Sequence, residues 1–387
     1  MRILTAGPTG VVAMQRVLNW HIEAGDDVWI TDYRNSFRRP LPPRFHFMPL
    51  LPLPRGNGAD MILHRLGLGA LAERAKQTRL RRLAAEARPD VIHIHSMDVR
   101  GQALARAGLG PLLVSAWGAL PSLLVAPDRL LRPAAQELLL ACDRLLVDAP
   151  ALVEPAQRRV KPGCQVEYMP FGTDTTAFQP GRSTRALEWR TFFAIPDDAF
   201  VLLSPRMWAD FYNHQQILRA FVLAYERFNR PVYLALVGLG GRPDALPHMH
   251  VAWQGVQHTP AAAAVRWLPR ILYQEMPTLY AMSDAVVNYP SRDAFAVTLV
   301  ETAACELPLI TSLLPAYRGT FVEDSARLVP ADDETALAEA MVEVVNQPAQ
   351  ARQDVLRAAR RIAVAEYDDA RVKQRLRQIY SEMAATS

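Results

Sequence analysis

Short apolar runs recur along the chain, and longer stretches with helical spacing of apolar residues separate them. Runs that are apolar at every position fit strands of a parallel sheet, because helices cover such strands on both faces. In the first half we expect strands at Ile3–Ala6, Val28–Thr31, Val91–His95, Leu112–Ala116, Leu145–Val147 and Val166–Met169. A second series is expected at Val201–Ser204, Tyr233–Val237, Val251–Trp253, Ala285–Val287 and Leu309–Thr311. The pattern predicts an α/β protein with two doubly wound, Rossmann-like domains.

The segment between the two series carries residues that interrupt secondary structure. They are Pro170, Gly172, Pro180 and Gly181. Such clusters are typical of linkers, and a chain of 387 residues is long for a single core. We therefore expect an N-terminal domain over residues 1–178 and a C-terminal domain over residues 179–367.

The end of the chain predicts one long helix, from Asp369 to Met383. Its apolar residues fall on one face and are Val372, Leu376, Ile379 and Tyr380. A one-sided apolar stripe is buried against another element in a folded protein. We expect residues 368–387 to pack back on the N-terminal domain.

Composition narrows the class of protein without naming a function. Half of the residues are hydrophobic and 21% are charged, as in ordinary globular proteins. A net charge of +4 is too small to indicate nucleic acid. The three cysteines have no metal or redox spacing, so we expect buried thiols in a reducing, cytoplasmic compartment: Cys142, Cys164 and Cys305.

Two stretches bear on membranes. Residues 107–127 carry no charge and are long enough to span a bilayer, but their prolines and glycines favour a strand at Leu112–Ala116 followed by a loop. The basic stretch from Arg65 to Arg88 fits a solvated helix face. An alternative interpretation is that this stretch makes weak, salt-sensitive contact with anionic lipid at the inner face of the membrane. The contact would be centred on Arg79, Arg81 and Arg82.

Two glycine-containing turns follow expected strands. Gly10 closes the turn after Ile3–Ala6, and Gly238 follows Tyr233–Val237. Small residues let backbone N–H groups approach a phosphate at a helix N-terminus. Neither turn is a complete dinucleotide fingerprint, so a plain tight turn is an equal alternative at Gly10. At Gly238 we expect a loop near a ligand.

His93 and His95 stand two positions apart in Asp90-Val-Ile-His-Ile-His, so both side chains point to one face of a strand. Two imidazoles can share a metal ion, but no third ligand stands near them in the sequence. A core histidine is the plainer interpretation of each. His95 is closer to the carboxyl end of the strand and is the better site candidate.

The strongest local pattern runs from Tyr289 to Glu306. A strand ends, a loop carries Asp293, and a helix continues to Glu301. The first turn of that helix, about Phe295 to Thr298, presents free N–H groups to an anion. Backbone donors for phosphate and carboxylates for hydroxyls describe a nucleotide-sugar site, although a helix with acidic residues at both ends is also common.

This segment resembles the E-x7-E region of the retaining family 4 glycosyltransferases, which belong to the glycosyl transferases group 1, with Asp293 at the first acidic position. Further motifs agree in order and spacing. They are Arg88-Pro-Asp-Val-Ile-His-Ile-His95, Tyr168-Met-Pro-Phe-Gly-Thr-Asp174, Leu203-Ser-Pro-Arg206-Met and Met276-Pro-Thr-Leu-Tyr280. The resemblance covers nearly the whole chain and implies a GT-B fold, in which two Rossmann-like domains face each other across a cleft.

The resemblance also implies roles for individual residues. Arg206 would bind the donor diphosphate, Glu301 the ribose and Asp293 the donor sugar. Backbone groups would approach the sugar and diphosphate at Phe295, Ala296, Val297, Thr298 and Leu299. From the other domain, Gly10 would lie by the donor phosphates and Trp117 would contact the same ligand. His95, Arg206 and Asp293 are the expected catalytic residues. No metal or other cofactor is expected.

Several positions depart from the family pattern. A lysine normally follows the arginine by several residues, but this stretch contains Tyr212 instead. Trp117-Gly118 replaces the usual His-Gly, and Leu120 replaces an aspartate found in some relatives. Two usual glycines are Ala296 and Glu306. The loss of one charge-assisted contact weakens binding by roughly 1.5–3 kcal/mol.

The expected function is retaining transfer of a sugar from a nucleotide-sugar donor to a glycan, lipid-linked or small-molecule acceptor. The main alternative is a catalytically inactive protein that binds sugar nucleotides or serves as a scaffold. An epimerase or phosphorylase-like enzyme on the same fold is a weaker alternative, because a fold alone does not fix a function.

Overall fold

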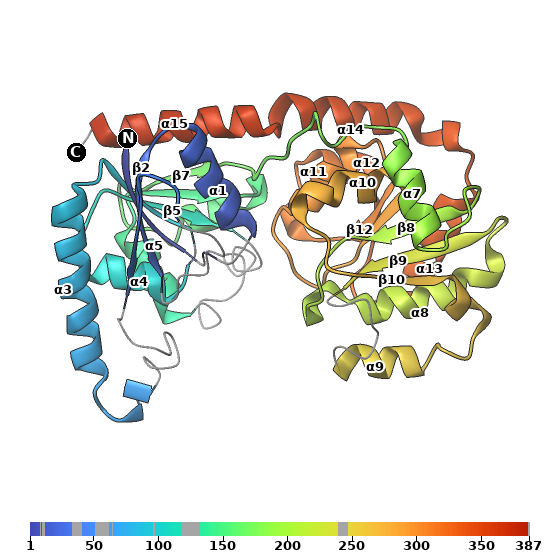
Figure 1. The fold of residues 1–387 in the computed structure, drawn as a ribbon, viewed down its shortest axis with the longest axis horizontal. Coiled ribbons are helices and arrows are strands. Elements are labelled where there is room, and N and C mark those ends of the chain that lie inside the picture. Colours follow the sequence, from blue (N-terminus) through green and yellow to red (C-terminus); the bar gives the residue numbers. More distant parts are fainter. Residues whose placement is uncertain are drawn as a thin grey trace. The chain divides into compact units, whose positions relative to one another are not determined.

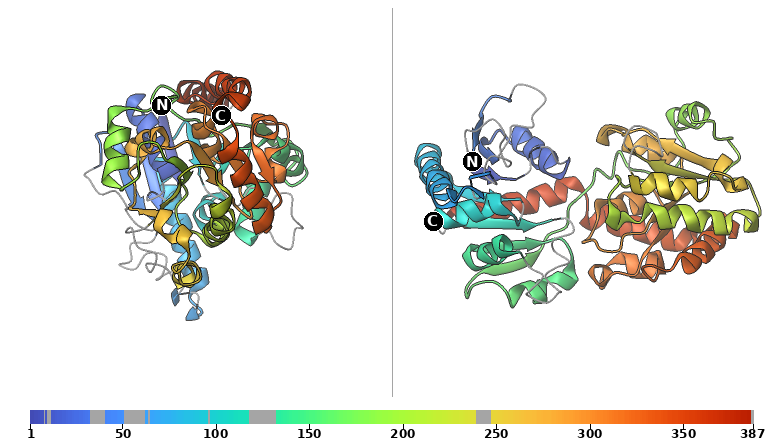
Figure 2. Two further views of the ribbon diagram at one scale, coloured as in Figure 1. Left: turned by 90° about the vertical axis from the view of Figure 1, so that its right-hand side faces the viewer. Right: turned by 90° about the horizontal axis from the view of Figure 1, so that it is seen from below.

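The structure is a computed structural model, and it describes residues 1–7, 9, 12–32, 41–50, 62–63, 65–95, 97–117, 132–238 and 247–385. The chain divides into two compact units. The N-terminal unit holds Met1–Pro170 and Lys373–Ser387, and the C-terminal unit holds Phe171–Val372. Each unit contains one parallel sheet with helices against both of its faces (Figures 1 and 2).

The sheet of the N-terminal unit has the strand order β3-β2-β1-β4-β5-β6-β7, and every neighbouring pair is parallel. The strands are β1 Arg2–Ala6, β2 Asp27–Asp32, β3 Phe45–Pro49, β4 Val91–Ile94, β5 Leu112–Ala116, β6 Arg144–Val147 and β7 Gln165–Tyr168. The helices include α1 Val12–Glu23, α3 Gly69–Ala87, α4 Val99–Arg106, α5 Pro133–Ala141 and α6 Val153–Gln157.

The sheet of the C-terminal unit has the order β10-β9-β8-β11-β12-β13, again with parallel neighbours. Its strands are β8 Phe200–Ser204, β9 Val232–Val237, β10 Val265–Leu268, β11 Ala285–Asn288, β12 Leu309–Ser312 and β13 Arg327–Val329. Its helices include α7 Thr184–Phe192, α8 His214–Ala224, α9 Pro247–Gln254, α10 Met276–Ala281, α11 Val297–Ala304, α12 Phe321–Ser325, α13 Glu334–Asn346 and α14 Gln353–Glu366. The last helix, α15 Asp369–Ala385, runs from this unit into the N-terminal one.

The predicted α/β class with two doubly wound domains is confirmed, but one expected strand is wrong. Val251–Trp253 lies in α9, where Val251 is exposed and Ala252 is buried. Three apolar residues in a row do not separate a strand from one turn of a half-buried helix. The strand in this part of the chain is β10, whose polar Arg266 interrupts the apolar run.

The boundary between the units falls eight residues before the expected one, after Pro170 rather than after Phe178. Residues 171–178 pack on the C-terminal unit because Thr173 forms a parallel bridge with Asp368 and Phe178 packs edge-on against Tyr280. Gly172 has no space for a side chain there, since a Cβ atom would lie 2.8 Å from a methyl group of Val372.

The final part of α15 is tied to the N-terminal unit by buried polar groups. The hydroxyl of Tyr380 lies 2.6 Å from Nδ1 of His93, and Arg377 forms an ion pair with Asp26. Burial alone would raise the pKa of Asp26, but His21, Arg377 and the N-terminal ammonium together hold it well below its ordinary value.

All three cysteines are buried and free. The sulfur atoms of Cys142 and Cys164 lie 3.5 Å apart.

Across the part of the chain that the structure describes, no helix combines the length and the apolar character needed to cross a membrane.

Candidate active site

The carboxyl ends of the strands in the C-terminal unit carry the first group of candidate residues. Arg206 follows β8 by two residues, and Asp293 lies in the loop between β11 and α11. Because β8 and β11 are parallel neighbours, their carboxyl ends lie side by side. The structure accordingly places Nη2 of Arg206 3.0 Å from Oδ2 of Asp293.

Two further side chains hold the guanidinium of Arg206. Its Nη1 donates to the hydroxyl of Thr298 in the first turn of α11, at 3.3 Å. Its Nη2 contacts the hydroxyl of Tyr212, and the guanidinium carbon lies 4.0 Å from the centre of the Tyr212 ring. Tyr212, at the position where the resembling family has a lysine, therefore supports Arg206 through its ring and its hydroxyl.

Burial and charge act in opposite directions on this group. Burial would lower the pKa of Arg206, but Asp293 and Tyr212 raise it above the ordinary value of an arginine. Burial raises the pKa of Asp293, and the nearby Arg206 and the N–H of Ala294 only partly oppose this effect. The pair is thus a cation held beside a carboxylate that has little contact with water.

The start of α11 lies next to the guanidinium of Arg206. Its N-cap residue is Ala296, which offers no side-chain oxygen, and no side chain caps this helix start. The N–H groups of Val297 and Thr298 thus belong to the first turn, where helical partners are lacking. The N–H of Leu299 donates to Ala296 O. The side chain of Phe295 packs in the interior, stacked on Tyr367, so only backbone atoms of this residue can serve a ligand.

Glu301 lies one turn further along α11 than Thr298 and is buried. Its Oε2 accepts a hydrogen bond of 2.8 Å from the hydroxyl of Tyr280 in α10. Tyr280 was part of a motif that resembles the family, yet its role as a partner of Glu301 has no signal in the sequence.

Gly238 follows β9, and its N–H donates to Leu268 O. A Cβ atom at this position would lie 2.6 Å from Nε1 of Trp208, so only glycine allows this approach. Trp208 in turn stacks on His214 with ring centres 4.8 Å apart and lies beside Trp267. Sequence analysis did not identify this aromatic group, because its members come from three separate segments.

Ala296 and Glu306 stand where the resembling family usually has glycine, and their backbone conformations differ. Ala296 has ordinary backbone angles at the helix start. Glu306 has φ of 54°, in the left-handed region that favours glycine, and this conformation ends α11. Its carboxylate lies 3.9 Å from Arg360.

The carboxyl edge of the other sheet, in the N-terminal unit, carries the second group of candidates. The ring of His95 is buried between those of His93 and Trp117, with ring centres 3.7 Å and 4.9 Å away. Both ring nitrogens of His95 are buried and have no hydrogen-bond partner among the residues that the structure describes. Burial, with a smaller effect of His21, lowers the pKa of His95 to about 3, so its ring is neutral at pH 7.

His93 has a structural role, because its two ring nitrogens lie within hydrogen-bonding distance of the hydroxyls of Tyr380 and Ser115. Gly10 and Leu120 lie outside the described residues. Thr9, next to Gly10, donates through its N–H and hydroxyl to Asp32 at the end of β2. Asp32 also accepts from Arg100, a contact that no motif of the sequence indicates.

Among the described residues, no three histidine, cysteine, aspartate or glutamate side chains are grouped in a way that would hold a metal ion. The chemistry of the C-terminal group is therefore that of a guanidinium, backbone N–H donors and carboxylates. These groups suit a diphosphate and the hydroxyls of a sugar.

The candidate residues of the C-terminal unit lie in a segment that matches a known protein family. Residues 187–362, which contain Arg206, Asp293 and Glu301, match the family described as glycosyl transferases group 1. No curated protein matches the chain.

Solved structures with the same fold cover nearly the whole chain. Sucrose-phosphate synthase from Thermosynechococcus elongatus has a TM-score of 0.77 at 18% identity, covering 100% of this chain and 99% of that one. Anabaena Alr3699/HepE in complex with UDP has a TM-score of 0.76 at 15% identity, covering 99% and 100%. An α,α-trehalose-phosphate synthase (UDP-forming) from Burkholderia vietnamiensis has a TM-score of 0.71 at 14% identity, covering 100% and 99%. At such low identities these likenesses show the fold, which is GT-B.

Proposed function

We propose that this protein transfers a sugar from a nucleotide-sugar donor to an acceptor, because residues 187–362 match the family described as glycosyl transferases group 1 and the chain has the GT-B fold. The acceptor would be a glycan, a lipid-linked sugar or a small molecule. In finer detail, we propose transfer of a hexose with retention of configuration and without a metal ion.

The observation that carries the proposal is the placement of Arg206 beside the uncapped start of α11. The guanidinium bonds to Thr298 in the first turn of the helix, so the cation and the backbone N–H groups face one small region. Both kinds of donor stabilise the charge that develops on a leaving diphosphate. Asp293 would contact the donor sugar, and Glu301 would accept from the ribose hydroxyls.

Two similar structures suggest which nucleotide to test first. Anabaena Alr3699/HepE was solved with UDP and also with UDP-glucose. We propose a uridine diphosphate sugar as the donor of this protein. In the N-terminal unit, the neutral His95 would border the reacting sugar, together with Trp117 and the turn at Gly10.

We also propose a location at the inner face of the cytoplasmic membrane, held by weak electrostatic attraction. The basic helix α3 and the segment before it carry the residues concerned. This attraction would be lost at high salt, since charges are screened within about 10 Å at roughly 0.1 M salt.

The test is a screen of nucleotide sugars by thermal shift and by donor hydrolysis, followed by calorimetric titration of UDP with and without a chelator. A donor that stabilises the protein and is consumed supports the proposal. UDP affinity that disappears with the chelator would contradict metal-independent binding.

The second candidate, an inactive sugar-nucleotide-binding protein, is favoured by one specific observation. The usual lysine is replaced by Tyr212, whose hydroxyl contacts Arg206 and offers no second cation. A donor that stabilises the protein and is never consumed, in the presence of a panel of acceptors, would support this candidate instead.

A further inference from the structure

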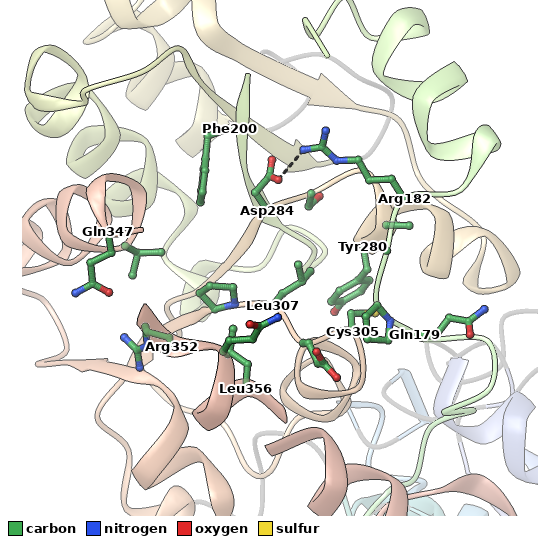
Figure 3. Close-up of a pocket in the computed structure, with 18 of the residues that line it drawn as sticks. Gln179, Arg182, Phe200, Tyr280, Asp284, Cys305, Leu307, Gln347, Arg352 and Leu356 are labelled. Carbon is green, nitrogen blue, oxygen red and sulfur yellow. Dashed lines mark hydrogen bonds and ion pairs between the residues drawn. The ribbon is translucent and has the colours of Figure 1, made fainter. Parts of the chain in front are cut away.

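A separate cavity of about 400 Å³ lies at the opposite, amino edge of the sheet in the C-terminal unit (Figure 3). Its wall includes residues at the starts of β8 and β12, the ends of α10, α11 and α13, and the start of α14. β8 has five residues, and a strand rises about 3.3 Å per residue, so the two edges are roughly 15 Å apart. The volume is within the range of small-molecule sites.

Two arginines near this cavity have structural roles. Arg190 is fully buried, and its donors reach four backbone carbonyls and the carboxylate of Asp284. Arg182 donates to the other oxygen of Asp284 and to Asp197 O. These two arginines compensate the charge of Asp284.

Two other arginines on the wall keep donors available. Arg230 is exposed and, among the described residues, makes no hydrogen bond or ion pair. Arg352 is half-buried and donates only to Ser325 O, so most of its five N–H donors are unused. The side chain of Asn346 accepts a hydrogen bond from the N–H of Asn229 and donates one to Arg227 O. These bonds tie the loop of Arg230 to the end of α13, which leads on to Arg352.

Amide side chains stand beside these arginines. Gln347 and Gln353 line the cavity, and the carbonyl oxygen of the Gln347 side chain is buried and has no partner within the described part of the chain. Figure 3 shows Gln347 and Arg352 on the side away from Arg182 and Asp284. The helix α14 begins at Gln353, directly after a 3-10 helix over Ala349–Arg352, and the N–H of Gln353 donates to Gln350 O. Guanidinium groups bind phosphate, and amides bind hydroxyls.

We propose that this cavity is a second ligand site and that it takes a small phosphorylated sugar. The phosphate contacts Arg230 and Arg352, and the sugar hydroxyls contact Gln347 and Gln353. The site does not depend on the proposed transfer reaction. Tyr280 lies between this cavity and the candidate active site, since it lines the cavity and its hydroxyl contacts Glu301.

The experiment titrates glucose 6-phosphate, inorganic phosphate and glucose into the full chain by calorimetry at low salt. The variants are Arg230→Ala and the double variant Arg230→Ala/Arg352→Ala. Arg219→Ala is the matched control, because Arg219 is an exposed arginine of the same unit that pairs with Glu334 outside the cavity. Arg206→Ala reports on the carboxyl-edge site.

We expect saturable binding of glucose 6-phosphate, at least tenfold weaker in Arg230→Ala, absent in the double variant and unchanged in Arg219→Ala and Arg206→Ala. Circular dichroism confirms that each variant is folded. The proposal is overturned if the parent binds no glucose 6-phosphate or if the double variant binds it as the parent does. Equal affinity for inorganic phosphate would overturn the sugar part. UDP binding is measured in parallel, so the two sites can fail independently.

Discussion

The guanidinium of Arg206 and the carboxylate of Asp293 are 3.0 Å apart in space and 87 positions apart in the sequence. The adjacency of β8 and β11 produces this contact, because parallel neighbours bring their carboxyl ends together. Both side chains are largely buried, so each depends on the other for compensation of its charge.

Removal of Arg206 should therefore affect both binding and stability. Arg206→Ala leaves Asp293 buried without its cation, which costs about 3–5 kcal/mol of unfolding free energy in comparable buried pairs. It should also weaken UDP binding at least tenfold, about 1.4 kcal/mol. Urea unfolding and calorimetric titration measure the two effects.

A second substitution separates these effects. Adding Asp293→Asn to Arg206→Ala removes the uncompensated charge, so stability should largely return while UDP affinity stays low. Asp293→Asn alone should lower turnover and spare binding of the bare nucleotide. If the double variant binds UDP as the parent does, Arg206 serves only to join two loops.

The contact between Tyr280 and Glu301 gives a second prediction. Glu301→Gln should weaken UDP binding at least tenfold, and Tyr280→Phe by a smaller factor of about three to ten, corresponding to roughly 0.7–1.4 kcal/mol. Tyr280 only orients the carboxylate, whereas Glu301 would contact the ligand. Tyr289→Phe is the control, because Tyr289 is a buried tyrosine bonded to Pro330 O. Equal losses of affinity in both tyrosine variants would argue against the role of Tyr280.

Tyr212 tests whether the departure from the family pattern limits donor binding. Tyr212→Lys should raise UDP affinity by about tenfold or more, because a charge-assisted contact to phosphate contributes roughly 1.5–3 kcal/mol. Tyr212→Phe keeps the ring beneath Arg206 and serves as the comparison. UDP affinity that falls in Tyr212→Lys would mean that the tyrosine ring, rather than a second cation, is what positions Arg206.

The fold was largely predictable, because fully apolar runs separated by helical patterns leave few arrangements other than covered parallel sheets. The strands that escaped prediction were β3, β10 and β13. In β10, Arg266 interrupts the apolar run. Its guanidinium lies over the ring of Tyr233 and donates to Phe193 O, and neither contact can be predicted from the sequence.

For the candidate site, the sequence predicts residues but not the contacts between them. Sequence motifs indicated Arg206, Asp293 and Glu301, and the fold brings Arg206 and Asp293 together. The partners Tyr212 and Tyr280 were not assigned, since such contacts depend on side-chain packing between distant segments. The left-handed conformation of Glu306 explains why relatives prefer glycine there, a constraint that the sequence alone does not reveal.

The next prediction concerns membrane association. The structure shows which side chains near the basic stretch are free to contact a lipid surface. Arg81 is partly engaged, because its Nε donates to Ala107 O. Exposed apolar side chains stand instead at the start of α3 and just before it: Ile62, Leu66, Leu68 and Leu71. We expect weak sedimentation with vesicles that contain phosphatidylserine, lost by about 0.5 M salt because screening then acts within roughly 4 Å.

Arg82→Glu should reduce this sedimentation, and Leu71→Ser should leave its salt dependence unchanged. Vesicles of neutral phosphatidylcholine are the control. Tight binding that persists at high salt would show that apolar insertion, through residues such as Leu66 and Leu71, dominates over electrostatic attraction.

The buried histidines predict how stability depends on pH. Because burial depresses the pKa of His95 to about 3, the unfolded chain binds a proton near pH 6.5 that the folded chain does not. The free energy of unfolding should thus fall as the pH falls from about 6.5 towards 3, by roughly 1.4 kcal/mol per pH unit for this histidine. Between pH 7 and pH 5 His95 accounts for a loss of about 2 kcal/mol. Burial lowers the pKa of His93 well below its ordinary value and adds a loss of the same sign.

His95→Phe keeps an aromatic ring at this buried position and removes its titration. Urea unfolding at pH 7 and pH 5, followed by circular dichroism, should show a smaller loss of stability in this variant than in the parent. His46→Gln is the control, because His46 is a largely exposed histidine of the same unit. If His95→Phe and the parent lose equal stability between the two pH values, the pKa of His95 is not depressed in the folded protein, and the proposal that its ring stays neutral at pH 5 is wrong.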